Sequence, residues 1–329
     1  MPAACSASGT ATLKSGGDAT AIATCTTFSG SIAIETGVGT DVDLGSIKTI
    51  KGDLVVKNND KLQRFAGSSL ETIQGKLTLD GVQELAALTL GALKEVDSLT
   101  MLGLANLHSL GFTTGVSKCN NLRIENTRLE NLEGINLEEA SSIVLANNYQ
   151  IDTINFPNIT NITDFLTLSF NNAMVNVSFP ELESANNISI RAIGSLSIPS
   201  LSKINVGDFG VFESDNLETI AAPKLTKIDG ALVINGNKGL KNISFDALTD
   251  VGANLLIANN TNLHEMEGLP KLENVQAALD MSGNFTKYVL SGKAISQKYT
   301  NQTQDRDAFS GLRQGCFQPP VDWRHRRHL

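Results

Sequence analysis

The sequence predicts an all-β protein, a right-handed parallel β-helix or solenoid of about twelve coils, each 22–23 residues long. Three observations predict this fold. An apolar residue recurs at intervals of 21 to 24 residues, another apolar residue follows it two positions later, and two further apolar corners complete each period. Repeats of this length cannot bury an apolar face singly, so they are expected to stack around one continuous core.

A short strand is expected to open each coil at its recurring apolar residue, the anchor. The position two residues later is also apolar, from Ile34 in the first repeat to Met281 in the last, and the residue between them is mostly small or polar. This alternation indicates a strand with one buried face. The anchors are Ile32, Leu54, Leu77, Leu99, Leu122, Ile143, Leu166, Ile188, Phe209, Leu232, Leu255 and Leu279.

The rest of each repeat predicts turns and further strands. Turns rich in Asn or Gly follow the first strand, as in residues 57–60 and 235–239, because both residue types tolerate left-handed backbone angles. Apolar residues about 8 and 16 positions after the anchor mark two more corners. Leucine-rich repeats of similar period usually place a helix in this half. Here Gly, Pro and β-branched residues interrupt it, so we expect strands.

The extent of the periodic pattern predicts the domain organisation. Residues 1–29 are expected to form an N-terminal cap with a Cys pair, and residues 30–286 the β-solenoid. Residues 287–329 contain no anchors and are expected to be an irregular basic tail, either disordered or produced by an altered reading frame or splice. The alternative is a functional tail for anionic surfaces.

Charge and composition exclude several function classes. The formal net charge is −8; residues 287–329 carry eight Lys or Arg against three Asp, a net of +5, which leaves −13 on residues 1–286. Nucleic-acid binding by the body is therefore not expected. No stretch approaches the roughly 18 consecutive apolar residues of a membrane-spanning helix.

The four cysteines differ in their settings. Cys5 and Cys25 flank the segment before the first coil, where a solenoid needs a cover over its open end. A disulfide between them would close a loop of about twenty residues and stabilise the fold by on the order of 3 kcal/mol. Two free thiols are the alternative in a reducing compartment. Cys119 is expected to be buried, and Cys316 lies in the tail.

Eight Asn-x-Ser/Thr sequons mark candidate N-glycosylation sites, a mild excess over chance that does not by itself establish secretion. Asn301 lies in the tail. The seven sequons in the solenoid are Asn158, Asn161, Asn176, Asn187, Asn242, Asn259 and Asn284.

No motif in the sequence indicates a cofactor, a metal site or a catalytic centre. There is no phosphate-binding loop and no His pair at zinc-ligand spacing. A polysaccharide-active enzyme would bring carboxylates from neighbouring coils together. Asp229 and Asp250 do fall on successive coils near a turn, but a solvated turn is the ordinary place for Asp.

Three sequence features carry a family resemblance. They are the opening "CSASGTATLKSGGDATAIATCTTFSGSIAI" (residues 5–34), the chained coils and the phrase "LEGINL" (residues 132–137). Over residues 5–286 the chain resembles the fungal GPI-anchored cell-wall organisation proteins, a family built on receptor L-domain, leucine-rich-like repeats. The resemblance implies a secreted, N-glycosylated protein held at the plasma membrane or wall by a lipid anchor. With secretion, Cys5 and Cys25 are expected to be linked.

Two departures from that family concern the ends of the chain. Residues 1–4 lack the apolar segment of a signal peptide, and the closing "WRHRRHL" lacks a hydrophobic anchor signal. We therefore expect this chain to be a fragment or altered form of such a protein. In the family, contact with the membrane would be only through a lipid anchor, which is absent from this chain as written.

The function expected from these features is that of a non-enzymatic cell-surface glycoprotein that supports fungal cell-wall organisation and integrity. Its expected location is extracellular, at the cell wall or outer plasma-membrane surface, and its partners would be cell-wall glycans or wall proteins. One alternative is a receptor-like module that binds a ligand on the outward sheet face; another is a polysaccharide-active β-helix enzyme. The residues of that candidate face are Thr78, Thr100, Arg123, Val144, Thr167 and Ser189. Strand propensity alone also explains their Thr and Val content.

Overall fold

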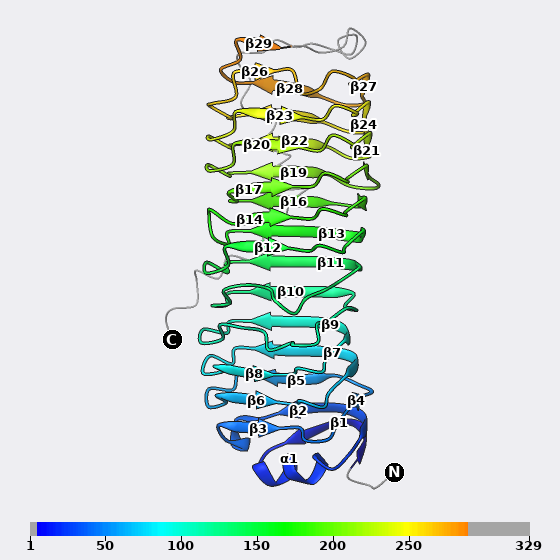
Figure 1. The fold of residues 1–329 in the computed structure, drawn as a ribbon, viewed down its shortest axis with the longest axis vertical. Helices are drawn as coiled ribbons and strands as arrows, with labels where there is room; N and C mark the ends of the chain where they lie inside the picture. The colour runs from blue at the N-terminus through cyan, green and yellow to red at the C-terminus, as the bar shows by residue number, and fades with distance from the viewer. Residues whose placement is uncertain (1–4, 289–329) are drawn as a thin grey trace.

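The computed structural model describes residues 5–288 and shows a rod of parallel coils stacked one upon another (Figure 1). Coils are numbered here 1 to 12 by their anchors, from Ile32 to Leu279. The predicted β-solenoid of about twelve turns is confirmed. Most of the tail predicted for residues 287–329 lies outside the described residues.

The main sheet runs the full length of the rod, and each coil contributes its anchor strand to it (Figure 1). Every neighbouring pair is parallel, and the register aligns all twelve anchors, from Ile32 opposite Leu54 to Leu255 opposite Leu279. The strands are β2 (Thr27–Ile34), β5 (Leu54–Lys57), β7 (Thr72–Asp80), β9 (Glu95–Leu102), β10 (Asn121–Glu125), β11 (Glu139–Ala146), β13 (Asn161–Ser169), β16 (Ile188–Arg191), β19 (Phe209–Phe212), β22 (Leu232–Asn235), β25 (Leu255–Ala258) and β28 (Leu279–Ser282).

The anchors form one buried ladder inside the rod. Those of coils 1 to 11 are at most 1% exposed. Six fully buried Phe side chains fill the wider parts of the core, and Phe156 stacks on Phe179 in the next coil with 5.1 Å between ring centroids. In coil 12, Leu279 and Met281 are only half-buried, because no described coil lies beyond them.

The remaining corners also form short strands in most coils, as predicted, but residues 103–120 and 126–138 of coils 4 and 5 contain no strand. One set precedes the anchor and joins the main sheet: β4 (Thr49–Ile50), β15 (Ser184–Ala185), β18 (Lys203–Ile204), β21 (Lys227–Ile228), β24 (Asp250–Val251) and β27 (Asn274–Val275). The other set forms four separate small sheets: β3 (Asp41–Asp43), β6 (Arg64–Ala66) and β8 (Ala87–Thr89); β12 (Thr153–Asn155), β14 (Asn176–Ser178) and β17 (Ser195–Ser197); β20 (Thr219–Ala221) and β23 (Asn242–Ser244); β26 (Glu265–Met266) and β29 (Lys287–Tyr288).

The N-terminal end is covered by elements that the periodicity did not predict. Strand β1 (Ser6–Leu13) pairs in parallel with β2, and helix α1 (Gly16–Ile22) follows it across the end of the rod (Figure 1). The helix begins with a capping box, in which Ser15 and Asp18 satisfy each other's backbone N–H groups. A 3-10 turn, η2 (Thr36–Val38), leads from coil 1 toward β3. No helix in the described part of the chain is long and apolar enough to cross a lipid bilayer.

The turn after the main strand repeats a fixed backbone conformation. The fourth residue after the anchor has positive φ in every coil from coil 2 to coil 11, which explains the Asn and Gly residues predicted to turn the chain there. Three successive coils depart from this preference, since they place Phe170, Ala192 and Glu213 in the same left-handed conformation, with φ of 50°, 57° and 47°.

The next position of the turn carries a buried hydrogen-bonded column, which we call the asparagine ladder. Its members are Asn59, Thr127, Asn148, Asn171, Ser214, Asn237 and Asn260. Asn237 shows the pattern: its Nδ2 donates to the Val211 carbonyl in the preceding coil (3.1 Å), and its Oδ1 accepts the Ser214 N–H (3.0 Å). Side-chain amides thus replace the backbone partners that a turn lacks.

Candidate functional site

The six residues of the candidate face lie in one column on the outward side of the main sheet. The parallel register places Thr78 beside Thr100, then Arg123, Val144, Thr167 and Ser189 on successive strands. Arg123 is exposed and the other five are half-buried by their neighbours. The column is therefore a shallow, largely uncharged strip.

The one cation of this strip is held by a carboxylate of its own strand. Arg123 Nε lies 2.8 Å from Glu125 Oε1, and the Glu125 side chain is 5% exposed against 50% for Arg123. A carboxylate so deeply buried needs a charged partner. Arg123 is therefore paired with Glu125.

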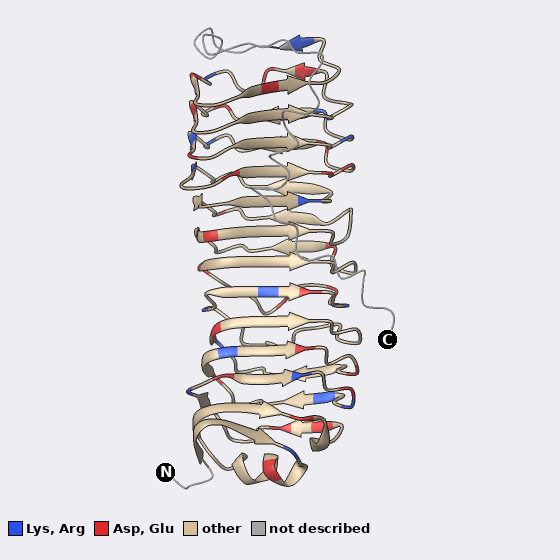
Figure 2. Ribbon diagram, turned by 180° about the vertical axis from the view of Figure 1, so that it is seen from behind, with Lys and Arg blue, Asp and Glu red and all other residues tan. Residues whose placement is uncertain are grey.

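Charged side chains concentrate at the turns, whereas most of the strand surface carries none (Figure 2). Many of them pair between neighbouring coils, such as Lys48 with Glu71 (3.1 Å) and Lys241 with Glu218 (2.6 Å). Because both partners in these pairs are about half exposed, each contributes only about 0–1 kcal/mol. Their main consequence is that the turns are hydrated and the sheet face is nearly neutral.

The two candidate catalytic acids are each engaged in separate contacts. Asp229 Oδ1 lies 2.7 Å from Lys227 Nζ, and this contact raises the pKa of Lys227. Asp250 accepts hydrogen bonds from Thr249 Oγ1 and Asn274 Nδ2, and these bonds lower the pKa of Asp250. In the sheet register Asp250 lies opposite Lys227, two residues away from Asp229. A general acid needs a raised pKa, and the pKa of Asp250 is lowered instead.

Acids that precede the main strand have a backbone-capping role. Asp53 Oδ1 accepts the Lys76 N–H (2.8 Å), and Asp208 Oδ1 accepts the Ala231 N–H (2.6 Å) in the next coil. No group of three or more His, Cys, Asp or Glu side chains within residues 5–288 could hold a metal ion.

Seven sequons lie in the C-terminal half of the described rod, from coil 6 to coil 12. Asn158, Asn176, Asn242, Asn259 and Asn284 are exposed, whereas Asn161 and Asn187 are half-buried. Some of these side chains already bond to a neighbouring coil: Asn161 Oδ1 accepts from Ser184 Oγ, and Asn284 Nδ2 donates to the Thr261 carbonyl. Asn301 lies outside the described residues.

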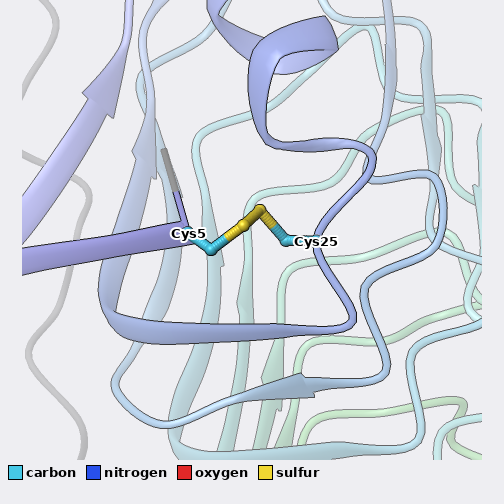
Figure 3. The surroundings of a disulfide bond; sticks show 2 residues. All are labelled: Cys5 and Cys25. Carbon is cyan, nitrogen blue, oxygen red and sulfur yellow. A yellow bond between two sulfur atoms is a disulfide. The ribbon is translucent and has the colours of Figure 1, made fainter. Parts of the chain in front are cut away.

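The cysteines divide into a linked pair and a buried thiol. Cys5 and Cys25 form a disulfide with their Cα atoms 5.6 Å apart, and it ties the start of β1 to the loop after α1 (Figure 3). Cys119 is buried, and burial raises the pKa of its thiol to about 12. A thiol with so high a pKa stays protonated and is unreactive at neutral pH. Cys316 lies beyond the described residues.

A cluster at the turns of coils 6 to 9 was missed by sequence reasoning. Only four large apolar side chains are exposed in the described chain, and three of them, Tyr149, Phe170 and Met174, belong to successive turns of coils 6 and 7. The available signal was the replacement of Asn or Gly at the left-handed position by Phe170, Ala192 and Glu213. That signal becomes visible only when the coils are aligned at this position.

Together these features define a class: a disulfide-capped, parallel β-solenoid with a nearly neutral sheet face. Disulfides persist in oxidising environments such as the cell surface. Comparison with known proteins identifies the family. The chain is 35% identical over 277 residues to a protein of Arthroderma benhamiae described as a cell surface GPI-anchored protein, with 84% of this chain and 70% of that relative covered.

Two further relatives agree. Protein ecm33 of Aspergillus fumigatus is 34% identical over 84% of this chain and 74% of the relative. Cell wall mannoprotein PST1 of Saccharomyces cerevisiae is 32% identical over 84% of this chain and 63% of the relative. The chain belongs to this family of fungal cell-surface, GPI-anchored cell-wall proteins.

No protein-family model matches the chain, and no solved structure matches it either. The likeness to receptor L-domain repeats therefore stays a prediction.

Proposed function

We propose that this chain is a non-enzymatic cell-surface glycoprotein that supports the organisation and integrity of the fungal cell wall. The observation that carries the proposal is the arrangement of the candidate acids along the rod. They bond to Lys, Thr, Asn and backbone groups and do not converge on a reaction site. Such a protein acts by offering its outer surface for contact with other molecules. The family adds cell-wall location to this inference.

The proposal includes three features of the mature protein. N-glycans at the exposed sequons would coat the C-terminal half of the rod, and a lipid anchor, as named for the relatives, would hold the protein at the membrane or wall. The domain limits would be a cap at residues 1–29, a solenoid at 30–286 and a tail from residue 287.

A second candidate function is ligand binding by the outward sheet face. The neutral column from Thr78 to Ser189 supports it, since a flat face without charge repulsion can accept a protein partner. A polysaccharide-active enzyme is the third candidate, with Asp229 and Asp250, on successive coils, as its candidate acids.

Complementation tests the structural role against the enzymatic one. A fungal strain lacking its family member would receive this chain with a secretion signal and an anchor signal, or the same protein carrying Asp229→Asn and Asp250→Asn. We expect both to restore resistance to wall-perturbing dyes. If the double variant is folded, exported and anchored but does not restore resistance, the enzymatic role replaces the structural one.

A further inference from the structure

We propose that the turns of coils 6 to 9 form a binding surface for an uncharged, extended polysaccharide of β-linked pyranoses. We call this surface the aromatic patch; its residues are Tyr149, Phe170, Met174, Arg191, Phe212 and Glu213. The inference rests on the proposed cell-wall function and deepens it by naming a partner class. The carboxyl ends of β11, β13, β16 and β19 lie one above another along this edge of the rod (Figure 1).

The patch exposes apolar surface where the rest of the rod does not. Tyr149 is 64% exposed, Phe170 45% and Met174 61%, whereas nearly every other large apolar side chain of the described chain is buried or half-buried. Adjacent turns stack directly, since the Asn147 N–H donates to the Ser169 carbonyl at 3.1 Å. The exposed rings therefore come from neighbouring levels of the rod.

The cation of the patch is paired with a carboxylate and lies close to two aromatic rings. The Arg191 guanidinium carbon lies 4.8 Å from the Phe212 ring centroid and 6.0 Å from that of Phe170. Arg191 Nη1 also lies 3.0 Å from Glu213 Oε1. Stacking and pairing hold this side chain in place. The patch has no net charge, which favours an uncharged ligand.

The backbone under the patch departs from the most stable choice. Phe170, Ala192 and Glu213 adopt left-handed angles where other coils use Asn or Gly. Strain of this kind accumulates at functional sites. Ser169 Oγ, directly before Phe170, is the only buried side-chain polar atom without a hydrogen-bond partner within residues 5–288. Such groups are rare in native structures and call for an explanation.

A shortened turn shapes the same edge. Six residues separate β13 from β14 and β19 from β20, but only three separate β16 from β17. The turns of coils 7 and 9 consequently meet across coil 8, where Asn216 Nδ2 donates to the Ala173 carbonyl at 3.1 Å. The turns thus form an open ridge along the rod axis.

The size and shape of the patch select the ligand class. Its three exposed apolar side chains offer on the order of 300 Å², well below the roughly 800 Å² per partner of a stable protein interface. An open ridge also suits a long chain better than a small molecule, which usually binds in an enclosed pocket. Pyranoses with equatorial substituents present flat C–H faces that pack on aromatic rings, and their hydroxyls can bond to Asn147, Asn172 and Glu213 at the rim.

The test is direct binding of soluble hexasaccharides to the full, enzymatically deglycosylated chain. Chitohexaose and cellohexaose serve as uncharged β-linked probes, and titration is followed by calorimetry up to millimolar concentrations. We expect binding that weakens by about tenfold or more in Tyr149→Ala/Phe170→Ala. The matched control is Val206→Ala, which removes the fourth exposed apolar side chain and should leave binding unchanged.

Three outcomes would overturn the proposal: no binding of either hexasaccharide, binding that survives the double substitution, or equal weakening by Val206→Ala. Asn176 lies two residues beyond Met174, so the chain's own glycan is a rival occupant. NMR can show whether the Tyr149 and Phe170 rings are shielded from solvent before deglycosylation and exposed after it. If they are, and neither hexasaccharide binds, the occupant is the chain's own glycan and the proposal is contradicted. Because this assay is done in solution, its failure leaves the wall role standing, whereas failure of complementation removes that role.

Discussion

The turn after the main strand is built differently in two neighbouring regions of the rod. In coils 9 to 11, Ser214, Asn237 and Asn260 continue the asparagine ladder, and each bonds to the coil before it. In coil 8 the equivalent residue is Ile193, the turn is three residues shorter, and Ala192 takes the left-handed angle. In the interrupted turn the Ile193 N–H still donates to Ser214 Oγ (3.2 Å), but the Ile193 side chain has no polar atom to offer the coil before it, beside the exposed rings of the aromatic patch.

The core beneath both regions should respond most strongly to substitution. Leu166→Asp places an unpaired charge in the anchor ladder, which costs several kcal/mol, and we expect loss of the folded state. Thr167→Asp is the matched control, because the next residue points outward and should melt close to the unsubstituted protein. Circular dichroism during heating distinguishes them. Equal melting of the two variants would show that the register of β13 is wrong.

Removal of the disulfide tests whether a loss of stability at the N-terminal end spreads along the rod. Replacing Cys5 and Cys25 by Ser opens a loop of 20 residues and should cost about 3 kcal/mol. Coils of a solenoid contact only their neighbours, so the loss should appear as faster hydrogen exchange in β1 to β5 and not in coils 8 to 11. Uniform loss of protection would show that both regions unfold as one unit with the cap.

The asparagine ladder should contribute measurably where it is complete. Asn237→Ala leaves the Ser214 N–H and the Val211 carbonyl without these partners, and we expect a loss of about 2 kcal/mol in the free energy of unfolding. Exposed Asn262→Ala, in the next coil, is the control and should change stability by less than about 0.5 kcal/mol. Denaturant unfolding measures both. Similar losses for the two would mean that the ladder is not stabilising.

The smallest effect is expected from relieving the interrupted turn. Ala192→Asn restores the residue type preferred at this left-handed position and should stabilise the protein by about 1 kcal/mol. It removes no ring of the aromatic patch, so hexasaccharide binding should not change. A decrease in stability would show that the backbone of coil 8 is not strained at Ala192.

The sequence predicted the core of this fold well because burial imposes a strict period. Each anchor must face inward, so spacing alone placed Leu54 beside Leu77 and Leu232 beside Leu255. Helix α1 was missed, since a cap occurs once and leaves no period. The asparagine ladder was predicted only as a set of turn residues. The tolerance of Asn for left-handed backbone angles explains Asn58, but it does not predict the hydrogen bond that the buried neighbour Asn59 donates to the preceding coil.

The candidate surfaces were predicted less completely. The column from Thr78 to Ser189 follows from strand alternation, and the structure places it on one face. The aromatic patch combines residues at different turn positions, such as Phe170 and Arg191, whose contact depends on how neighbouring turns stack. Spacing within a single repeat cannot encode that contact.

Phe170→Asn tests most directly whether this edge of the rod gives up stability for function. The substitution restores the preferred residue type at a left-handed position and removes an exposed ring, while Asn171 keeps its place in the ladder. The measurement pairs the melting temperature with rescue of wall-dye resistance in the complemented strain. We predict a higher melting temperature together with weaker rescue. A higher melting temperature with full rescue would contradict the account, because the strained aromatic residue would then have no role at the wall.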